Sequence, residues 1–184
     1  MAGKLKGVDL RQHGSGNLGA TNVVRVLGAK IGAAVFVVDV LKGFLPVFFL
    51  PRYTDTLQPN LWALAFGVAA ILGHVKPVFL LWRGGGKGVA TAAGVFAALA
   101  PIPSLITFGV WVTVFFVTRY VSLASIIGAI ALPTAIWYFN NGTPQAVFDA
   151  SILIAAFVVW THRANIGRLR RGEEHRFVKK QVQS

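Results

Sequence analysis

The 184-residue sequence has no cysteine and few acidic side chains. The absence of cysteine excludes a disulfide framework, a thiolate metal site and a cysteine nucleophile. The four histidines, His13, His74, His162 and His175, show no metal-ligand spacing, and no Ser-His-Asp order stands out. We therefore expect neither a bound metal nor a cofactor, and no catalytic triad.

Charged residues are also scarce: they make up 13% of the chain, against 55% hydrophobic residues, and the mean hydropathy is +0.64. This balance is typical of a membrane protein, and we expect one membrane-embedded domain over residues 1–184. Eighteen Lys and Arg against six Asp and Glu give a net charge of +12. The aromatic residues lie in apolar runs and not among the basic ones, so we expect no nucleic-acid partner. Anionic membrane lipids and phosphorylated substrates fit the charge better.

Long apolar runs predict an all-α bundle of transmembrane helices, since about 20 apolar residues cross the hydrocarbon core as a helix. Pro101 and Pro103 break the uncharged run 89–118, where we predict two short helices that span only with tilt or local thinning of the bilayer. Six helices result in all. The other four predicted spans are 31–50, 61–81, 121–139 and 146–160.

Basic residues divide unequally between the two sides of such a bundle. If residues 1–30, the loop 76–87, Arg119 and the tail 162–184 share one side, that side holds every Lys and Arg except Lys42 and Arg52. The excess of positive charge predicts that this side is cytoplasmic. The same side carries three polar clusters, so we expect a cytoplasmic active site.

The first cluster is GSGNLGATN, residues 14–22. It matches G-x-G-x-x-G, but the residues before it make a poor buried strand, which argues against a dinucleotide-binding turn. A polar glycine-rich loop before a helix can instead bind phosphate, with Thr21 and Asn22 capping the helix and Arg25 nearby. The alternative is a flexible loop with an ordinary cap.

The second cluster is RGGGKG, residues 83–88. A P-loop would need glycine at Leu81 and a hydroxyl residue at Gly88, so nucleotide binding of that kind is excluded. Successive backbone N–H groups, a helix N-terminus and Lys87 still suit a phosphate. A positive-inside anchor would explain Arg83 and Lys87, but it gives no reason for four glycines.

The third cluster, THRANIGRLRRGEE, follows the last span. His162 and Asn165, three residues apart, face the same side of a helix, and Glu173 lies beyond them. A basic juxtamembrane stop signal accounts for the arginines, but it does not account for His162 or Asn165.

Two buried charges need a partner within the first span. Asp39 and Lys42 lie three apart on one helical face, where we predict a structural ion pair, and we expect His74 to satisfy a helix end. A small transporter or channel for a phosphorylated solute could also show such a pair and broken helices. That alternative fits less well, because the charges gather on one face and no inverted repeat is visible.

Taken together, GSGNLGATNVVRVLG, GHVKPVFLLWRGGGKGVATAAG and THRANIGRLRRGEE resemble the bacterial acyl-phosphate-dependent glycerol-3-phosphate acyltransferases of the PlsY family. The resemblance extends over essentially the whole chain. It implies transfer of a fatty acyl group from acyl phosphate to the 1-hydroxyl of sn-glycerol 3-phosphate, giving lysophosphatidic acid and inorganic phosphate. The resemblance also implies that neither acyl-CoA nor acyl carrier protein donates the acyl group directly. It implies a functional link to the enzyme that makes acyl phosphate. The expected location is the bacterial inner membrane.

The resemblance also assigns site residues and a helix count. It implies seven transmembrane helices, whereas the apolar helix expected before Lys4 is missing here, which suggests a misplaced start site or a truncated chain. Arg83 takes the place of a basic residue in the second motif and is a candidate contact. Ser15, Lys87 and His162 are the candidate catalytic residues. The candidate substrate-binding residues are Gly14, Gly16, Asn17, Gly19, Arg25, Gly85, Gly86, Gly88, Asn165 and Glu173.

Overall fold

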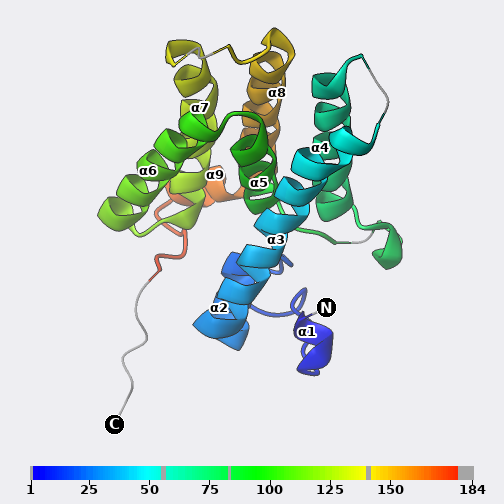
Figure 1. The fold of residues 1–184 in the computed structure, drawn as a ribbon. Helices are drawn as coiled ribbons and strands as arrows, with labels where there is room; N and C mark the ends of the chain where they lie inside the picture. The colour runs from blue at the N-terminus through cyan, green and yellow to red at the C-terminus, as the bar shows by residue number, and fades with distance from the viewer. Residues whose placement is uncertain (1, 55–56, 83, 140–141, 178–184) are drawn as a thin grey trace.

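The computed structural model describes residues 2–54, 57–82, 84–139 and 142–177, and every regular element in these ranges is a helix (Figure 1). Six apolar helices, α3 to α8, form the bundle, which confirms the predicted all-helical membrane architecture. Arg83 lies outside the described residues. The elements are α1 (Ala2–Leu5), α2 (Ala20–Leu27), α3 (Ala29–Phe49), η1 (Leu50–Tyr53), α4 (Pro59–Val75), η2 (Val78–Leu80), α5 (Val89–Leu99), α6 (Pro101–Thr118), α7 (Val121–Tyr138), α8 (Gln145–Thr161) and α9 (Arg163–Arg170).

The six apolar helices differ in length. Three described segments are long and apolar enough to cross a membrane: α3 continued through η1, α6 and α7. The pair α8 and α9 gives a fourth if it counts as one span bent by 57°, whereas α4 and α5 are shorter apolar helices. The break at Ala100 is confirmed, because the residue before a proline avoids helical geometry, and Ala100 has φ −144° and ψ 73°. The expectation that both halves are short was wrong for α6, which has 18 residues.

Two predictions need correction at the basic end of the bundle. The second span was expected to continue to Leu81, but α4 ends at Val75, since Pro77 cannot continue the hydrogen-bond ladder and forces Lys76 out of the helical region. Residues 1–30 include two helices: α2 is the helix predicted after the first glycine-rich cluster, and α1 was not predicted.

Small residues allow α3 and α5 to pack closely. A side chain at Gly43 would overlap the backbone oxygen of Thr91, and one at Gly94 would overlap that of Val40. Such contacts replace the hydrophobic effect as the source of helix association inside a bilayer. The buried core beside this contact includes Val47 of α3, Val95 of α5 and, from the neighbouring helices, residues such as Ile71, Leu132 and Val147.

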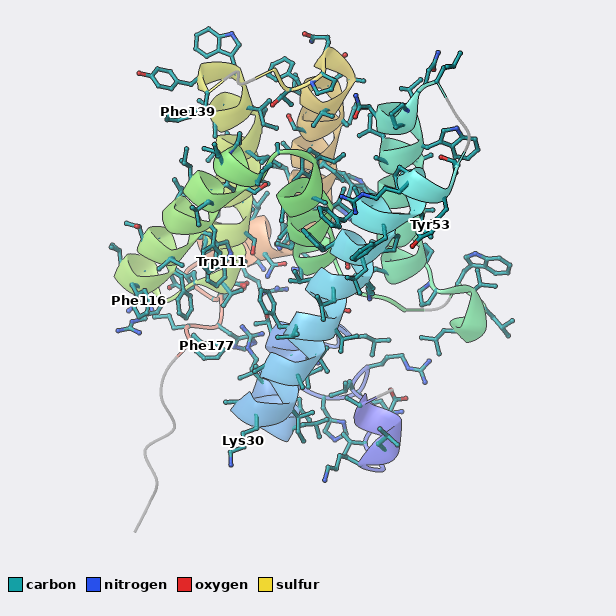
Figure 2. The ribbon with its side chains drawn as sticks, in the orientation of Figure 1. Lys30, Tyr53, Trp111, Phe116, Phe139 and Phe177 are labelled. Carbon is teal, nitrogen blue, oxygen red and sulfur yellow. The ribbon has the colours of Figure 1, made fainter. Side chains whose placement is uncertain are left out.

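The two ends of the bundle carry different residues. Figure 2 shows Phe139 at one end and Lys30 at the other, with Phe177 on the side of Lys30. The segment after α9 returns to the bundle at that end, where the N–H of Phe177 donates to the carbonyl of Arg119 and its ring lies 5.7 Å from that of Phe115. Helix α2 lies at the same end (Figure 1). The three polar clusters of the sequence therefore meet at one end of the bundle.

Candidate active site

The loop before α2 is shaped by the buried side chain of Asn22, which is 1% exposed. Its amide nitrogen donates to the carbonyls of Leu10 (3.2 Å) and His13 (3.0 Å), and its Oδ1 accepts from the backbone N–H of Ser15 (2.8 Å). Gly14 has φ +61°, and a side chain there would overlap Oδ1 of Asn22. Asn22 thus holds the first motif in a fixed turn.

The N-terminus of α2 faces this loop, but it is not capped as the sequence suggested. The N-cap is Gly19, and no side chain caps the helix; Thr21 and Asn22 lie inside it, so their predicted capping roles were wrong. Asn17 accepts from the N–H of Gly19 at 2.7 Å. The next N–H groups, at the start of the helix, have no carbonyl four residues earlier to bind, and Ser15 beside them is exposed. This arrangement suits an anion.

The glycines of the second motif are explained largely by packing. A side chain at Gly85 would overlap the backbone oxygen of Val75, and one at Gly86 would overlap the ring of His74. The N–H of Gly86 donates to the carbonyl of His74 at 3.2 Å. Gly88 has φ +80° and is the N-cap of α5. The loop therefore rests on the end of α4 and presents Lys87 from a tightly defined backbone.

The first and second motifs adjoin one another. The position that a Cβ of Gly84 would occupy lies 3.5 Å from the side chain of Arg11 and 3.7 Å from that of Leu18. Gly84 itself has φ +73°, a conformation that favours glycine. Two glycine loops from distant parts of the sequence are thus placed next to each other.

Lys87 begins a chain of buried polar contacts that reaches the third motif. Its ammonium donates to Oδ1 of Asn165, and Nδ2 of Asn165 donates to Glu174 at 2.6 Å. The same carboxylate accepts from the hydroxyl of Ser122 (2.8 Å) and from Nε of Arg168 (2.8 Å). We call these residues, Lys87, Ser122, Asn165, Arg168 and Glu174, the polar cluster. Helices α7 and α9 and the segments before α5 and after α9 all contribute to it.

The electrostatics of the polar cluster follow from burial. Burial lowers the pKa of Lys87 to about 8, although the charge of Glu174 opposes this. Burial alone would raise the pKa of Glu174, but hydrogen bonds from Asn165, Ser122 and Arg168 outweigh it and lower that pKa. At neutral pH the cluster holds two cations and one anion. Its net positive charge can therefore attract an added phosphate.

Arg25 and His162 adjoin the polar cluster. Arg25, at the end of α2, interacts with the charges of Glu174, Arg168 and Lys87, and burial lowers its pKa. His162 is 3% exposed, and its Nδ1 lies 2.8 Å from the carbonyl of Val158. Since a carbonyl only accepts, Nδ1 carries the proton in this contact and Nε2 is left as an acceptor. Burial, and then the charge of Lys87, lower the pKa of His162 to about 4.

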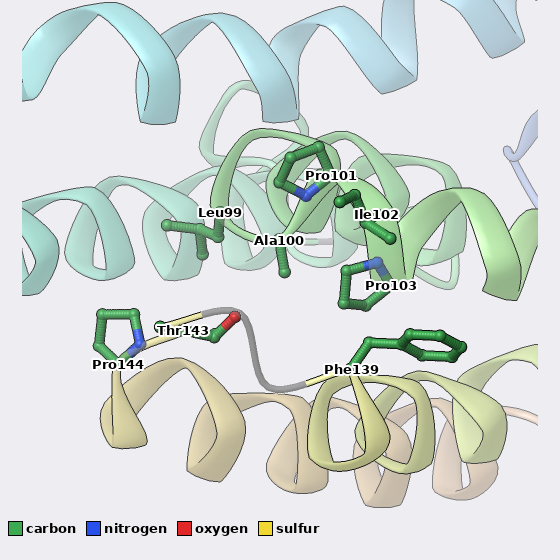
Figure 3. A pocket seen from close by; sticks show the side chains of 9 residues that line it. Leu99, Ala100, Pro101, Ile102, Pro103, Phe139, Thr143 and Pro144 are labelled. Atoms are coloured by element: carbon green, nitrogen blue, oxygen red, sulfur yellow. The ribbon is translucent and has the colours of Figure 1, made fainter.

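Of two cavities among the described helices, one adjoins this arrangement. A pocket of about 240 Å³ lies at the α5–α6 break and contains none of the candidate residues (Figure 3). An apolar groove of about 290 Å³ runs between α4, α5 and α8. Two of its residues also lie against Gly88: a Cβ at Gly88 would be 3.4 Å from the side chain of Ile71 and 3.7 Å from that of Phe157. The groove therefore leads to the loop that carries Lys87. The groove is lined by Leu64, Gly67, Val68, Ile71, Leu72, Val95, Phe96, Ala150, Leu153, Ile154 and Phe157.

Comparison with known proteins assigns the chain to a family. A family model described as glycerol-3-phosphate acyltransferase matches residues 1–172. The chain belongs to this acyltransferase family. Among curated members, the Aquifex aeolicus glycerol-3-phosphate acyltransferase is 49% identical over 95% of this chain and 88% of its own, and the Fusobacterium nucleatum protein is 44% identical over 94% and 86%.

Solved structures of the acyltransferase family agree with this assignment. The glycerol 3-phosphate form of PlsY, an integral membrane glycerol 3-phosphate acyltransferase, superposes with a TM-score of 0.84 at 48% identity, covering 95% of this chain and 85% of that one. Its lysophosphatidic acid form gives 0.82 at 47% identity. The PlsY resemblance inferred from the three motifs is confirmed.

The structure groups most, but not all, of the residues that the acyltransferase motifs suggested. Lys87, Asn165, His162 and Arg25 come together, and the backbone of Gly85, Gly86 and Gly88 sets the position of Lys87. Ser15 and its loop, with Gly14, Gly16, Asn17 and Gly19, lie beside the second motif and make no described hydrogen bond to Lys87.

The prediction of the acidic site residue was wrong by one position. Glu173 is exposed and pairs with Arg171 at 2.7 Å, so the structure does not bring it into the polar cluster. Glu174 is the buried carboxylate, and sequence reasoning missed it together with Ser122 and the role of Arg168. Neighbouring glutamates after a helix give no signal of which one turns inward. In the part of the chain that the structure describes, no cluster of three metal-ligating side chains occurs.

Proposed function

We propose that this acyltransferase moves a fatty acyl group from acyl phosphate to the 1-hydroxyl of sn-glycerol 3-phosphate, releasing lysophosphatidic acid and inorganic phosphate. The observation that carries the proposal is the juxtaposition of a partly buried cationic cluster around Lys87 with an apolar groove that ends at the same loop. A phosphorylated polar substrate and a fatty chain can meet only where both kinds of surface adjoin.

Glycerol 3-phosphate would bind through its phosphate. Lys87, Arg25 and Arg168 supply the positive charge, and charge-assisted hydrogen bonds to phosphate are about twice as strong as neutral ones. Asn165 and His162 then have polar groups left for the glycerol hydroxyls. Holding the two substrates in contact lowers the entropic part of the barrier.

The donor phosphate would lie at the first motif. The N-terminal N–H groups of α2, with the hydroxyl of Ser15, can stabilise the charge that develops on the departing phosphate and on the carbonyl oxygen. The fatty chain would extend into the apolar groove. This placement explains why so small an acyl acceptor is handled inside a membrane protein.

The reaction needs one bond formed, one bond broken and one proton moved. The 1-hydroxyl oxygen attacks the acyl carbonyl carbon, and the bond from that carbon to the phosphate oxygen breaks. The hydroxyl proton passes to an oxygen of the departing phosphate, or to the unprotonated Nε2 of His162. A mixed anhydride is already activated, so no covalent protein nucleophile is required.

The bundle orientation follows the distribution of charge. With the end that carries Lys30 and the three motifs facing the cytoplasm, the positive-inside rule is obeyed and soluble glycerol 3-phosphate has direct access. We place the enzyme in the bacterial inner membrane, and the enzyme that supplies acyl phosphate is its expected functional partner.

Purified enzyme in proteoliposomes tests the proposal. Labelled glycerol 3-phosphate would be offered with acyl phosphate, acyl-CoA or acyl carrier protein as donor, and lysophosphatidic acid and phosphate would be quantified. We expect both products in equal amounts with acyl phosphate alone. Lysophosphatidic acid formed from acyl-CoA alone would show that acyl-CoA, and not acyl phosphate, is the donor. Uptake of label into sealed vesicles without product would indicate a transporter. Arg52→Met, which removes a cation at the far end of α3, is the control and should retain activity.

A further inference from the structure

A second, partly buried group of polar side chains lies directly beneath the loop that carries Lys87. Asp39 and Lys42 are one turn apart on α3, with Nζ of Lys42 2.5 Å from Oδ1 of Asp39. The same Nζ lies 2.7 Å from Nδ1 of His74 on α4. The predicted structural ion pair is confirmed, but it continues into a third residue on another helix. We call Asp39, Lys42 and His74 the triad; the side chain of Lys42 is 40% exposed, whereas the other two are buried.

The contacts of the triad fix the state of its imidazole. An ammonium group has no acceptor capacity, so Nδ1 of His74 accepts from Lys42 and the ring proton is on Nε2. Asp39 and the side chain of His74 are almost fully buried, at 6% and 8% exposed. A single ammonium therefore orients both an acid on α3 and a ring on α4.

The other edge of the imidazole supports the glycine loop. Nε2 of His74 occupies the space into which a side chain of Gly86 would project, and the N–H of Gly86 donates to the carbonyl of His74. Gly86 immediately precedes Lys87. The ring is thus fixed by Lys42 on one side and in contact with the loop on the other.

We propose that Asp39, Lys42 and His74 are positioning residues, which set the place of Lys87 relative to Asn165 by supporting the backbone of Gly86. Among the described residues, no hydrogen bond or ion pair joins the triad to the polar cluster, whereas His74 touches Gly86, so we infer that the effect of the triad passes through the loop. This inference rests on the proposed function. Displacing a reacting or binding group by about 1 Å can cost about 100-fold in rate.

The double variant Asp39→Leu with Lys42→Met, which leaves no donor beside Nδ1 of His74, separates positioning from charge compensation. It leaves no unpaired buried charge, so folding is expected to be retained, but it removes the donor that orients His74. We expect kcat/KM for glycerol 3-phosphate to fall about 10- to 100-fold in the monodisperse fraction, with the loss shared between kcat and KM. Wild-type kinetics with only a changed melting temperature would overturn the proposal.

Two single variants test the hydrogen bond itself. Lys42→Gln retains amide N–H groups that can bridge Asp39 and His74, and it should keep at least ten times the activity of Lys42→Met. His74→Phe keeps a ring against Gly86 and loses the acceptor Nδ1. We therefore expect it to lose as much activity as Lys42→Met. Equal activities of Lys42→Gln and Lys42→Met, or an active His74→Phe, would count against the triad. Arg52→Met serves again as the matched loss of a cation from the α3 region.

A readout without turnover distinguishes failure of this inference from failure of the proposed function. An amine-directed acylating reagent, followed by mass spectrometry of the Lys87 peptide, reports the labelling rate of Lys87 against pH. We expect the double variant to alter this profile and Arg52→Met to leave it unchanged. If the wild-type protein makes no lysophosphatidic acid, the proposed function fails, while the labelling profile still decides whether the triad positions Lys87.

Discussion

Replacing Glu174 by Gln should move the alkaline limit of activity to lower pH. Gln has nearly the same volume and keeps an oxygen that accepts from Asn165, but its amide nitrogen takes the place of the oxygen that accepts from Arg168. The variant therefore loses one buried negative charge together with the hydrogen bond from Arg168. That charge currently favours the protonated form of Lys87, whose pKa is about 8. Without it, Lys87 loses its proton more readily, and its pKa must fall.

The size of the shift can be worked from the contacts. Two hydrogen bonds of about 2.9 Å across one amide group put the ammonium of Lys87 and the carboxylate of Glu174 about 6–8 Å apart. At an effective dielectric constant of about 20, unit charges at that separation interact by about 2–3 kcal/mol. Screening by water at the open side reduces this to about 1.4 kcal/mol, which corresponds to about one pKa unit. We therefore expect the alkaline limb of the pH–activity profile to move from near pH 8 to near pH 7.

The assay is the pH dependence of kcat/KM for glycerol 3-phosphate, measured below saturation in proteoliposomes. In the proposed site the ammonium of Lys87 binds the phosphate, so we expect affinity to be complete below the pKa of Lys87 and to fall as pH rises through it. At pH 7.5 the protonated fraction of Lys87 should drop from roughly three quarters to roughly one quarter. The substrate phosphate, with a second pKa near 6, shapes the acid limb in both enzymes alike. An unmoved limb, or a shift to higher pH, would refute the electrostatic reasoning.

Glu173→Gln removes the same charge one residue earlier. Glu173 is exposed and pairs with Arg171, so its charge is screened by water and should leave the alkaline limb in place. If the alkaline limb of this variant shifted as much as that of Glu174→Gln, Glu173 would have to be counted among the site residues.

Three further substitutions address the loops and the groove. Lys87→Met should lower kcat/KM by about 100- to 1,000-fold, since one preorganised charge is lost, while the melting temperature in detergent stays within a few degrees. Asn22→Ala leaves three backbone groups, of Leu10, His13 and Ser15, without their partner; at about 1 kcal/mol per group, and about 2–4 °C per kcal/mol for a chain of this size, it should lower the melting temperature by roughly 6–12 °C. Ala150→Phe should narrow the apolar groove, and competition between acyl phosphates of different length should then favour shorter chains; an unchanged preference would remove this groove as the chain site.

Helix positions were largely predictable because apolar runs and breakers act locally. The spans predicted over 31–50, 121–139 and 146–160 agree with α3, α7 and α8 to within two residues. The error at the end of α4 came from reading apolar residues past Pro77, although proline is a strong local stop signal. Local chemistry thus sufficed where it was applied consistently.

The candidate site was less predictable, because its contacts join residues far apart in the chain. The motifs named Lys87 and Asn165, but no spacing indicates that Glu174 and not Glu173 turns inward, or that Ser122 supports it. The glycines at 85 and 86 suggested a phosphate cradle, whereas their first requirement is close contact with the end of α4. A packing requirement and a binding role select the same residue type, and only the tertiary structure separates them.

The shortness of α5 suits a polar site to the proposed lipid donor. Eleven residues give a helix of about 16 Å, against a hydrocarbon core of about 30 Å, so its two ends cannot both lie at the membrane surfaces. At the end that carries Lys87, Gly88 lies against Phe157, about one helical turn before α8 ends at Thr161. The loop is therefore recessed below the end of its neighbour. A recess of this kind lets an acyl carbonyl, which sits just below the lipid headgroups, reach the polar cluster while its chain remains among apolar helices.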